Sequence, residues 1–185
     1  LSPKQLRNYQ KEAILHQMYL PQSMLWLGCG RGKTVATLTT IDHRLEAGQI
    51  QKVLVFAPQR VCHAVWEQEA RKWEHTRHLR FSMVSWPDEK KRLRHLFYDA
   101  DIYLCNYENM GWLSNVLHHY YLDRGEPLPF QMVVYDECTR VKDSTTQRMR
   151  GGRSTRKVGG ERVTKQIKGW RKIIEHIPYT TGLTG

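Results

Sequence analysis

Gly28-Cys29-Gly30-Arg31-Gly32-Lys33-Thr34 is the stretch that decides the fold of this chain. It follows an apolar run at 23–27 that predicts a short buried strand, and it leads into a helical pattern. A glycine-rich turn between a strand and a helix lets backbone N–H groups surround a phosphate, with the positive helix end facing it. We therefore predict a phosphate-binding loop, in which Lys33 reaches the outer phosphates and the Thr34 hydroxyl binds Mg²⁺. The strict pattern would begin with glycine at the position of Leu27, but the three glycines present still give a permissive turn.

A second stretch, Met132-Val133-Val134-Tyr135-Asp136-Glu137, places two carboxylates at the end of another apolar run. Asp136 lies 103 residues after Lys33. A carboxylate pair that ends a buried strand is costly unless it binds something. We predict that Asp136 holds Mg²⁺ through water and that Glu137 orients the attacking water. The two stretches together predict a nucleotide triphosphatase that uses ATP and Mg²⁺, whereas either stretch alone would be weak evidence.

The hydrophobic pattern alternates between strands and helices along the chain. Val, Ile and Leu-rich strands separated by helices predict an α/β fold with a central, mainly parallel sheet. Since ligands in such sheets bind outside the carboxyl ends of the strands, the segments that directly follow strands should share one edge. These segments are 28–34, Pro58, Asn106, Asp136 and Thr184. The expected strands are 23–27, 52–57, 80–85, 101–105 and 131–135, and the expected helices are 5–18, 33–47, 61–73, 88–97, 110–122 and 163–176.

Size and composition favour one globular domain. The chain has 185 residues, 40% of them hydrophobic, which supports a sizeable core and argues against disorder. No apolar run is long enough for a membrane span, and the first residues do not resemble a signal peptide. The four cysteines form no Cys-x-x-Cys pair, so we expect free, reduced thiols and a cytoplasmic protein of a bacterium or of a phage-infected cell.

The positive charge is concentrated near the end of the chain. Residues 148–172 hold ten Lys or Arg and one acid, Glu161, and so carry +9 of the net charge of +11. Glycine pairs inside this segment predict a flexible basic insertion at about 144–162. Concentrated positive charge favours a polyanionic partner, most often nucleic acid, over a solvated loop. The candidate phosphate contacts are Arg150, Arg153, Arg156 and Lys157.

Six short stretches, spread over nearly the whole chain, occur in one order. They are Leu6-Arg7-Asn8-Tyr9-Gln10; Gly30-Arg31-Gly32-Lys33-Thr34-Val35; Phe56-Ala57-Pro58 followed by Trp66, Glu69 and Trp73; Cys105-Asn106-Tyr107-Glu108; Asp136-Glu137-Cys138-Thr139-Arg140-Val141-Lys142-Asp143; and Leu183-Thr184-Gly185.

Together these stretches resemble the first RecA-like lobe of superfamily-two helicases, nearest to the Snf-type DNA translocases. The resemblance implies a three-layer RecA-like P-loop fold, an adenine contact through Gln10, and a phosphate site built from Gly28, Gly30, Arg31, Gly32, Lys33 and Thr34. It also implies that the backbone around Pro58, Gln59 and Arg60, and around Asn106 and Tyr107, contacts one DNA strand along its phosphates. Trp66 and Trp73 are interpreted as core residues of an amphipathic helix. A phage source is also expected.

The resemblance further implies partners: duplex DNA, and a second RecA-like lobe that this chain lacks. That lobe supplies arginine fingers, and an arginine finger contributes about 10³–10⁵ in rate, so the isolated lobe is expected to hydrolyse ATP slowly or not at all. The chain departs from the family at Cys138-Thr139, which replace a small residue and a histidine that often couples hydrolysis to DNA binding. This departure leaves open whether ATP hydrolysis is coupled to DNA binding, but it does not put the predicted metal site in doubt.

Other functions remain open from the sequence. The enzymatic alternatives are the motor lobe of an RNA helicase or of a restriction enzyme. A non-catalytic nucleic-acid-binding module is a different class, against which the complete set of Lys33, Thr34, Asp136 and Glu137 argues. A small-molecule kinase is disfavoured by the Asp-Glu pair and the order of the motifs.

Overall fold

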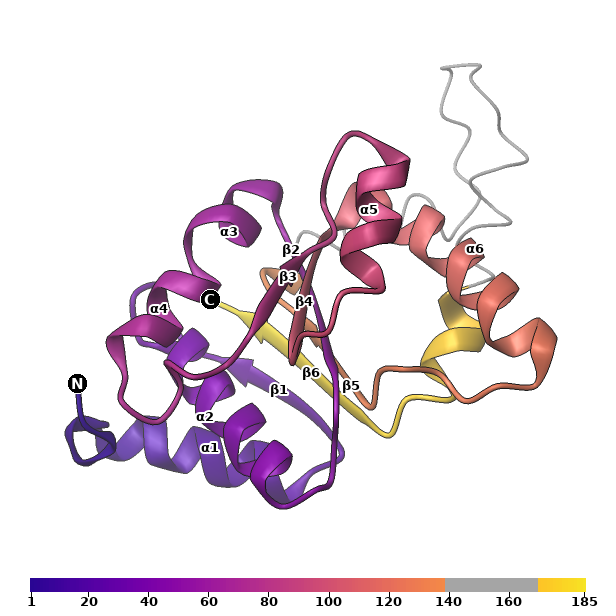
Figure 1. Ribbon diagram of the computed structural model, residues 1–185. Helices are drawn as coiled ribbons and strands as arrows, with labels where there is room; N and C mark the ends of the chain where they lie inside the picture. Colours follow the sequence, from indigo (N-terminus) through magenta and orange to yellow (C-terminus); the bar gives the residue numbers. More distant parts are fainter. Residues whose placement is uncertain (139–169) are drawn as a thin grey trace, which may run out of the picture.

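A computed structural model, of which residues 1–138 and 170–185 are described, shows a protein with a parallel sheet at its centre (Figure 1). Six strands are hydrogen-bonded in the order β1-β6-β5-β2-β4-β3, and every pair is parallel. This confirms the predicted α/β class. The strands are β1 Gln22–Trp26, β2 Val53–Ala57, β3 Phe81–Met83, β4 Ile102–Asn106, β5 Met132–Tyr135 and β6 Tyr179–Thr184.

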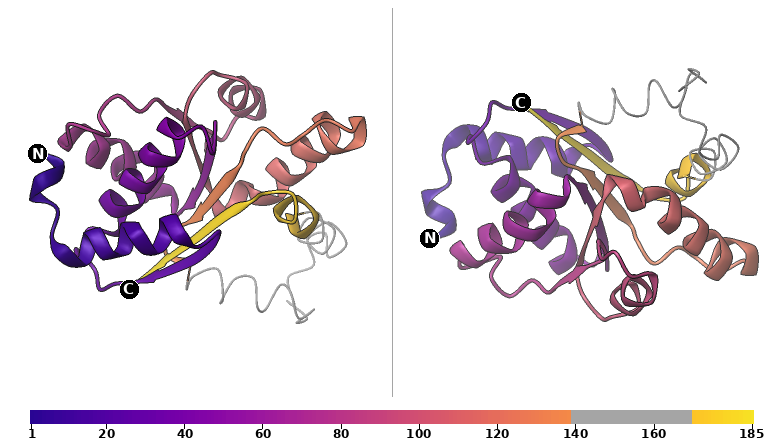
Figure 2. Two further views of the ribbon diagram at one scale, coloured as in Figure 1. Left: turned by 90° about the horizontal axis from the view of Figure 1, so that it is seen from below. Right: turned by 90° about the horizontal axis from the view of Figure 1, so that it is seen from above.

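Helices cover both faces of the sheet, so the molecule has three layers (Figure 2). The α-helices are α1 Asn8–Tyr19, α2 Lys33–Glu46, α3 Gln59–Ala64, α4 Trp66–Lys72, α5 Glu89–Leu96 and α6 Met110–Tyr120, and the 3₁₀ turns are η1 Pro3–Gln5, η2 Tyr107–Asn109 and η3 Leu122–Arg124. A further helical turn at 170–174 precedes β6.

Alternation along the strands builds two separate cores. Val53 and Val55 of β2 pack toward α1, α2 and α4, whereas Leu54 and Phe56 pack toward α6 and the turn at 170–174. All five residues of β2 are completely buried, because helices lie on both sides of this central strand. The uninterrupted apolar runs that predicted the strands are the consequence of this double burial.

Two of the expected helices, 5–18 and 61–73, differ from the structure at their boundaries. The helix expected at 5–18 begins at Asn8, because Leu6 and Arg7 are extended and the Gln10 side chain accepts the Arg7 backbone N–H at 2.9 Å. The helix expected at 61–73 is two helices, α3 and α4, divided at Val65 with φ −105°. Val65 is β-branched and therefore a weak helix former, and the break coincides with complete burial of Trp66 at the start of α4.

Some sequence expectations fall outside the described residues. These are the basic insertion at about 144–162, with Arg150, Arg153, Arg156 and Lys157, and the first half of the helix expected at 163–176. Within the described residues, no helix has the length and apolar character needed to cross a bilayer. All four cysteines are free, as predicted, with Cys62 and Cys105 buried in the two cores.

Candidate nucleotide and magnesium site

The predicted phosphate-binding loop joins β1 to α2 and depends on two left-handed glycines. Gly30 has φ 72° and Gly32 has φ 77°, a region that residues with a Cβ rarely adopt. Gly32 is the residue from which α2 starts, and its carbonyl accepts the Ala36 N–H at 3.1 Å. The loop therefore delivers the N-terminus of a 14-residue helix, with its unpaired N–H groups, to the end of β1.

Lys33 is the first residue of α2 and its ammonium group turns back along the loop. Nζ donates to the Leu27 carbonyl at 2.5 Å and to the Gly28 carbonyl at 3.3 Å. The ammonium group also lies near Gly185, the residue just after β6, where an added Cβ would be 2.7 Å from Nζ. Thr34 follows it in the first turn of α2 and is half-buried.

Gln10 joins α1 to the phosphate-binding loop. Its side-chain amide donates to the Arg31 carbonyl at 3.3 Å while its oxygen accepts the Arg7 N–H. A Cβ on Gly32 would clash with Gln10 Nε2, so the amide fits only because residue 32 has no side chain. The predicted adenine residue is thus packed directly against the predicted phosphate site.

Gly32→Ala is expected to cost more than any other single-methyl change in the loop. Alanine at position 32 would be strained by the left-handed φ, at a cost of about 1–2 kcal/mol, and its Cβ would clash with the Gln10 amide. We expect a lower melting temperature and nucleotide binding weakened at least about tenfold, or about 1.4 kcal/mol. Gly48→Ala is the matched control, because Gly48 has φ 68° but a methyl group there would meet no atom within 4 Å.

Binding by calorimetry and melting by circular dichroism measure the two effects. Adding Gln10→Ala to Gly32→Ala should recover part of the lost melting temperature, since the clashing amide is removed. If Gly32→Ala and Gly48→Ala melt and bind alike, the close packing of Gln10 on Gly32 does not matter for the site.

Asp136 lies directly after β5 and is held on three sides. Its Oδ2 accepts the Trp66 indole N–H at 2.9 Å, its Oδ1 accepts the Glu137 backbone N–H at 3.0 Å, and its carbonyl accepts the Tyr107 hydroxyl at 2.6 Å. Asp136 is 7% exposed. Burial raises the pKa of Asp136, while the Trp66 and Glu137 hydrogen bonds and the charge of Lys33 lower it. The carboxylate is thus fixed in place and disfavoured as an isolated charge, which suits a cation ligand.

Glu137 adopts an unusual backbone conformation. Its φ is 53°, which makes it the one non-glycine residue with positive φ among residues 1–138 and 170–185. Such a conformation costs about 1–2 kcal/mol in a residue with a Cβ. Observed strain of this kind is concentrated at functional sites, so the turn after β5 supports the predicted role of Glu137.

The sheet brings the two predicted halves of the site together. β6 lies between β1 and β5, with Leu25 beside Leu183 and Tyr135 beside Gly182. Neighbouring strands are about 4.8 Å apart, so the ends of β1 and β5 are separated by about 10 Å. A hydroxyl from Thr34 and a carboxylate from Asp136 are hard oxygen donors of the kind that Mg²⁺ prefers. The residues present therefore fit a nucleotide phosphate and its magnesium ion.

The segments predicted to contact nucleic acid lie on the same edge, one and two strands further along. Pro58 and Gln59 follow β2, Tyr107 follows β4, and these strands are neighbours with Ala57 opposite Asn106. Gln59 and Arg60 are exposed at the start of α3.

The side chains of Asn106 and Tyr107, at the end of β4, bond to other residues of the protein. Asn106 donates to Glu108 at 2.8 Å and accepts from Asn109 at 2.6 Å. Burial raises the pKa of Tyr107, whose ring stacks near Phe56. Both side chains thus have hydrogen-bond partners within the protein, and contacts from the backbone here stay a prediction.

Trp66 and Tyr107 both bond Asp136, a role in the site that the sequence did not assign to either side chain. Trp66 is the core residue that was predicted, yet its only polar atom bonds Asp136. Tyr107 was chosen for its backbone, but its hydroxyl bonds the Asp136 carbonyl. Periodicity marks Trp66 as apolar and cannot show where its N–H points, because that depends on how α4 packs against β5.

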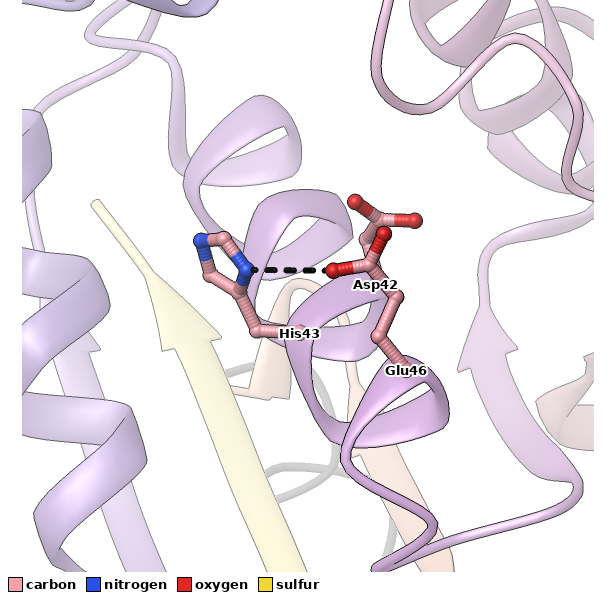
Figure 3. Close-up of side chains that lie close together, drawn as sticks. All are labelled: Asp42, His43 and Glu46. Atoms are coloured by element: carbon pink, nitrogen blue, oxygen red, sulfur yellow. Dashed lines mark ion pairs between the residues drawn. The ribbon is translucent and has the colours of Figure 1, made fainter.

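A separate cluster on α2 combines a histidine and two carboxylates (Figure 3). The ligand atoms of Asp42, His43 and Glu46 lie within 4.8 Å of one another. His43 Nδ1 is 4.0 Å from Glu46, and the 3%-exposed Asp42 is 3.3 Å from His78 Nε2. Since each carboxylate already has a histidine nearby, we interpret the cluster as local side-chain pairs rather than a metal site.

Solved structures share this fold. The Sulfolobus solfataricus SWI2/SNF2 ATPase core in complex with dsDNA matches 97% of the chain at a TM-score of 0.67 and 21% identity, and the chain covers 32% of it. The UvsW helicase from bacteriophage T4 matches 97% of the chain at a TM-score of 0.65 and 15% identity, and the chain covers 52% of it. The predicted phosphate-binding loop and the Asp-Glu pair thus lie on a fold that these solved structures share.

The amino-acid sequence also has a phage relative. Protein p41 of Acyrthosiphon pisum secondary endosymbiont phage 1 is 32% identical over 150 residues, which is 80% of this chain and 31% of that protein. The chain thus spans about a third of this curated relative. A family model described as "Type III restriction enzyme, res subunit" matches residues 3–185. The chain therefore belongs to that family, and it has the RecA-like fold of helicase cores.

Proposed function

We propose that this chain is the ATP-binding and ATP-hydrolysing first lobe of a DNA-dependent, Snf-type translocase. One observation carries the proposal: Lys33 and Thr34 after β1, and Asp136 and Glu137 after β5, meet at one sheet edge on either side of β6. Four residues with complementary phosphate, metal and water roles share this edge, as ATP hydrolysis requires.

Each residue has one role in the proposed hydrolysis. The backbone N–H groups at the start of α2 bind the phosphates, and the Lys33 ammonium moves from the Leu27 carbonyl to the outer phosphate oxygens. Thr34 and Asp136 hold the magnesium ion, which when bound neutralises charge on the phosphates. Glu137 orients the water that attacks the terminal phosphorus and accepts its proton. Gln10, fixed by Arg7 and Arg31, contacts the adenine edge.

A second RecA-like lobe, in the remainder of a longer protein, completes the proposed site. It would add an arginine finger, worth about 10³–10⁵ in rate. The chain spans 30–52% of the solved helicase structures that it matches, so those proteins have room for such a lobe. This chain alone is expected to bind ATP and to turn it over slowly.

Duplex DNA is the proposed partner. Support comes from the net charge of +11 and from exposed Gln59 and Arg60 beside the nucleotide site. The solved Sulfolobus protein, whose fold is shared, was in complex with dsDNA. Contacts to the phosphate backbone of DNA do not depend on the base sequence and weaken as the salt concentration rises. A restriction-enzyme motor lobe is the second candidate, favoured by the description of the family model.

ATP turnover by the longer, two-lobed protein tests the proposal. We expect duplex DNA to stimulate turnover, and we expect a Lys33→Ala variant to show no such stimulation. The stimulation should fall steeply between 50 and 200 mM salt, because a protein that makes 6–10 phosphate contacts loses about 10³–10⁵ in DNA affinity over that range. Duplex RNA is the comparison substrate. Binding to DNA without any turnover would favour the non-catalytic binding module, and stimulation by RNA alone would favour an RNA helicase.

A further inference from the structure

The magnesium ligand proposed above is bonded by two side chains, one from a segment proposed to contact DNA and one from the helix that follows the other such segment. Trp66 lies in α4, just after α3 and Pro58, and Tyr107 directly follows Asn106. We infer that Trp66 and Tyr107 are positioning residues that fix Asp136 and link it to those two segments. This inference rests on the proposed function.

The Trp66 contact reaches the carboxylate itself. The indole ring is completely buried, and Nε1 donates to Asp136 Oδ2 at 2.9 Å across 70 residues of sequence. Indole has one donor and no acceptor, so this hydrogen bond fixes one carboxylate oxygen in a single direction. Groups that hydrogen-bond a metal ligand set its orientation and hence the affinity of the metal.

The Tyr107 contact reaches the backbone of the same residue. Its hydroxyl donates to the Asp136 carbonyl at 2.6 Å, and its ring stacks on Phe56 with centroids 6.0 Å apart. Phe56 also stacks on Tyr135, the last residue of β5. Tyr107 thus ties the end of β4 to the turn that carries Asp136 and Glu137.

These contacts give a short physical route from the nucleic-acid segments to the magnesium ligand. Gln59 and Arg60 begin α3, and only Val65 separates α3 from Trp66. A movement of α3 and α4 against β5, or of η2 against β5, must stretch one of the two bonds to Asp136. By linkage, whatever nucleic-acid binding does to Mg·ATP affinity, Mg·ATP must do to nucleic-acid affinity.

The test measures the gain in ATP affinity that Mg²⁺ provides, using this 185-residue chain with ATP in Mg²⁺ or in EDTA. Trp66→Phe keeps a buried ring and removes the N–H, so we expect it to lower that gain about tenfold. Tyr107→Phe removes only a hydroxyl that bonds a neutral carbonyl, and we expect a smaller loss, about threefold to tenfold. ATP affinity in EDTA should change in neither variant.

Trp73→Phe is the matched control. Trp73 is also a buried tryptophan just after α4, but its N–H bonds Glu69 at 3.2 Å rather than Asp136. We expect it to leave the Mg²⁺-dependent gain unchanged. Equal losses in Trp66→Phe and Trp73→Phe would overturn the inference, because both would then act through packing alone.

A second arm adds duplex DNA to the same titrations. The DNA-induced change in Mg·ATP affinity should shrink in Trp66→Phe and Tyr107→Phe and persist in Trp73→Phe; persistence in all three would refute the link to the nucleic-acid segments. If Trp66→Phe does not fold, the milder Tyr107→Phe decides the outcome. Absence of any Mg²⁺-dependent ATP binding by the unmodified chain would instead remove the proposed function itself.

Discussion

Lys33→Ala is expected to reduce ATP turnover by the two-lobed protein about 10²–10³-fold or more, the loss that follows removal of one donor to a reacting oxyanion. Nucleotide binding by this chain should weaken about 10–100-fold, because a charge-assisted hydrogen bond contributes about 1.5–3 kcal/mol. Lys33 donates to the carbonyls of Leu27 and Gly28 in the present structure. Both residues reach solvent, so water can replace the ammonium and the fold should keep its melting temperature.

The control for this change is Lys52→Ala. Lys52 lies just before β2, at the opposite edge of the sheet, with Nζ 5.6 Å from the centre of the Tyr103 ring. The Lys52→Ala substitution removes the same charge from the molecule without changing the glycine-rich loop, so turnover and nucleotide affinity should stay as they are. Nucleotide binding by Lys33→Ala that matches that of the unmodified chain would mean that the glycine-rich loop does not hold phosphate.

The sequence was sufficient to predict the α/β class and the shared edge of the sheet. Both follow from local rules: strands buried on two faces are uninterrupted apolar runs, as in β2, and parallel strands end on one side. The loop can be recognised in the sequence because the left-handed φ angles at positions 30 and 32 favour glycine strongly. The Asp-Glu pair is evident because acids rarely end an apolar strand.

Contacts that depend on how helices pack could not be predicted. The indole N–H of Trp66, directly after the break at Val65, bonds Asp136 at 2.9 Å. No spacing rule relates residues 66 and 136. Likewise the clash that keeps residue 32 free of a side chain comes from Gln10, which lies on another helix. Such contacts decide how rigid the site is, while the motifs decide only its chemistry.

Glu137→Gln is expected to lower turnover about 10²–10⁴-fold, the usual contribution of a general base, while Mg·ATP binding stays intact. Glutamine keeps the size of the side chain and loses the charge that accepts a proton from water. It also has the same left-handed backbone cost as glutamate at φ 53°, so the melting temperature should not change. Glu126→Gln, an exposed residue before the amino end of β5, is the control for loss of one acid.

The value of this variant lies in separating the two neighbouring carboxylates. Asp136 is buried and bonded by Trp66, and its proposed role is to hold the magnesium ion, so Asp136→Asn should abolish the Mg²⁺-dependent gain in affinity. In the proposed mechanism Glu137 acts on water only in the transition state, so its loss should appear in kcat and not in binding. A Glu137→Gln protein that loses Mg·ATP affinity to the same degree as Asp136→Asn would show that both carboxylates hold the metal, and the residue that activates water would then have to come from elsewhere.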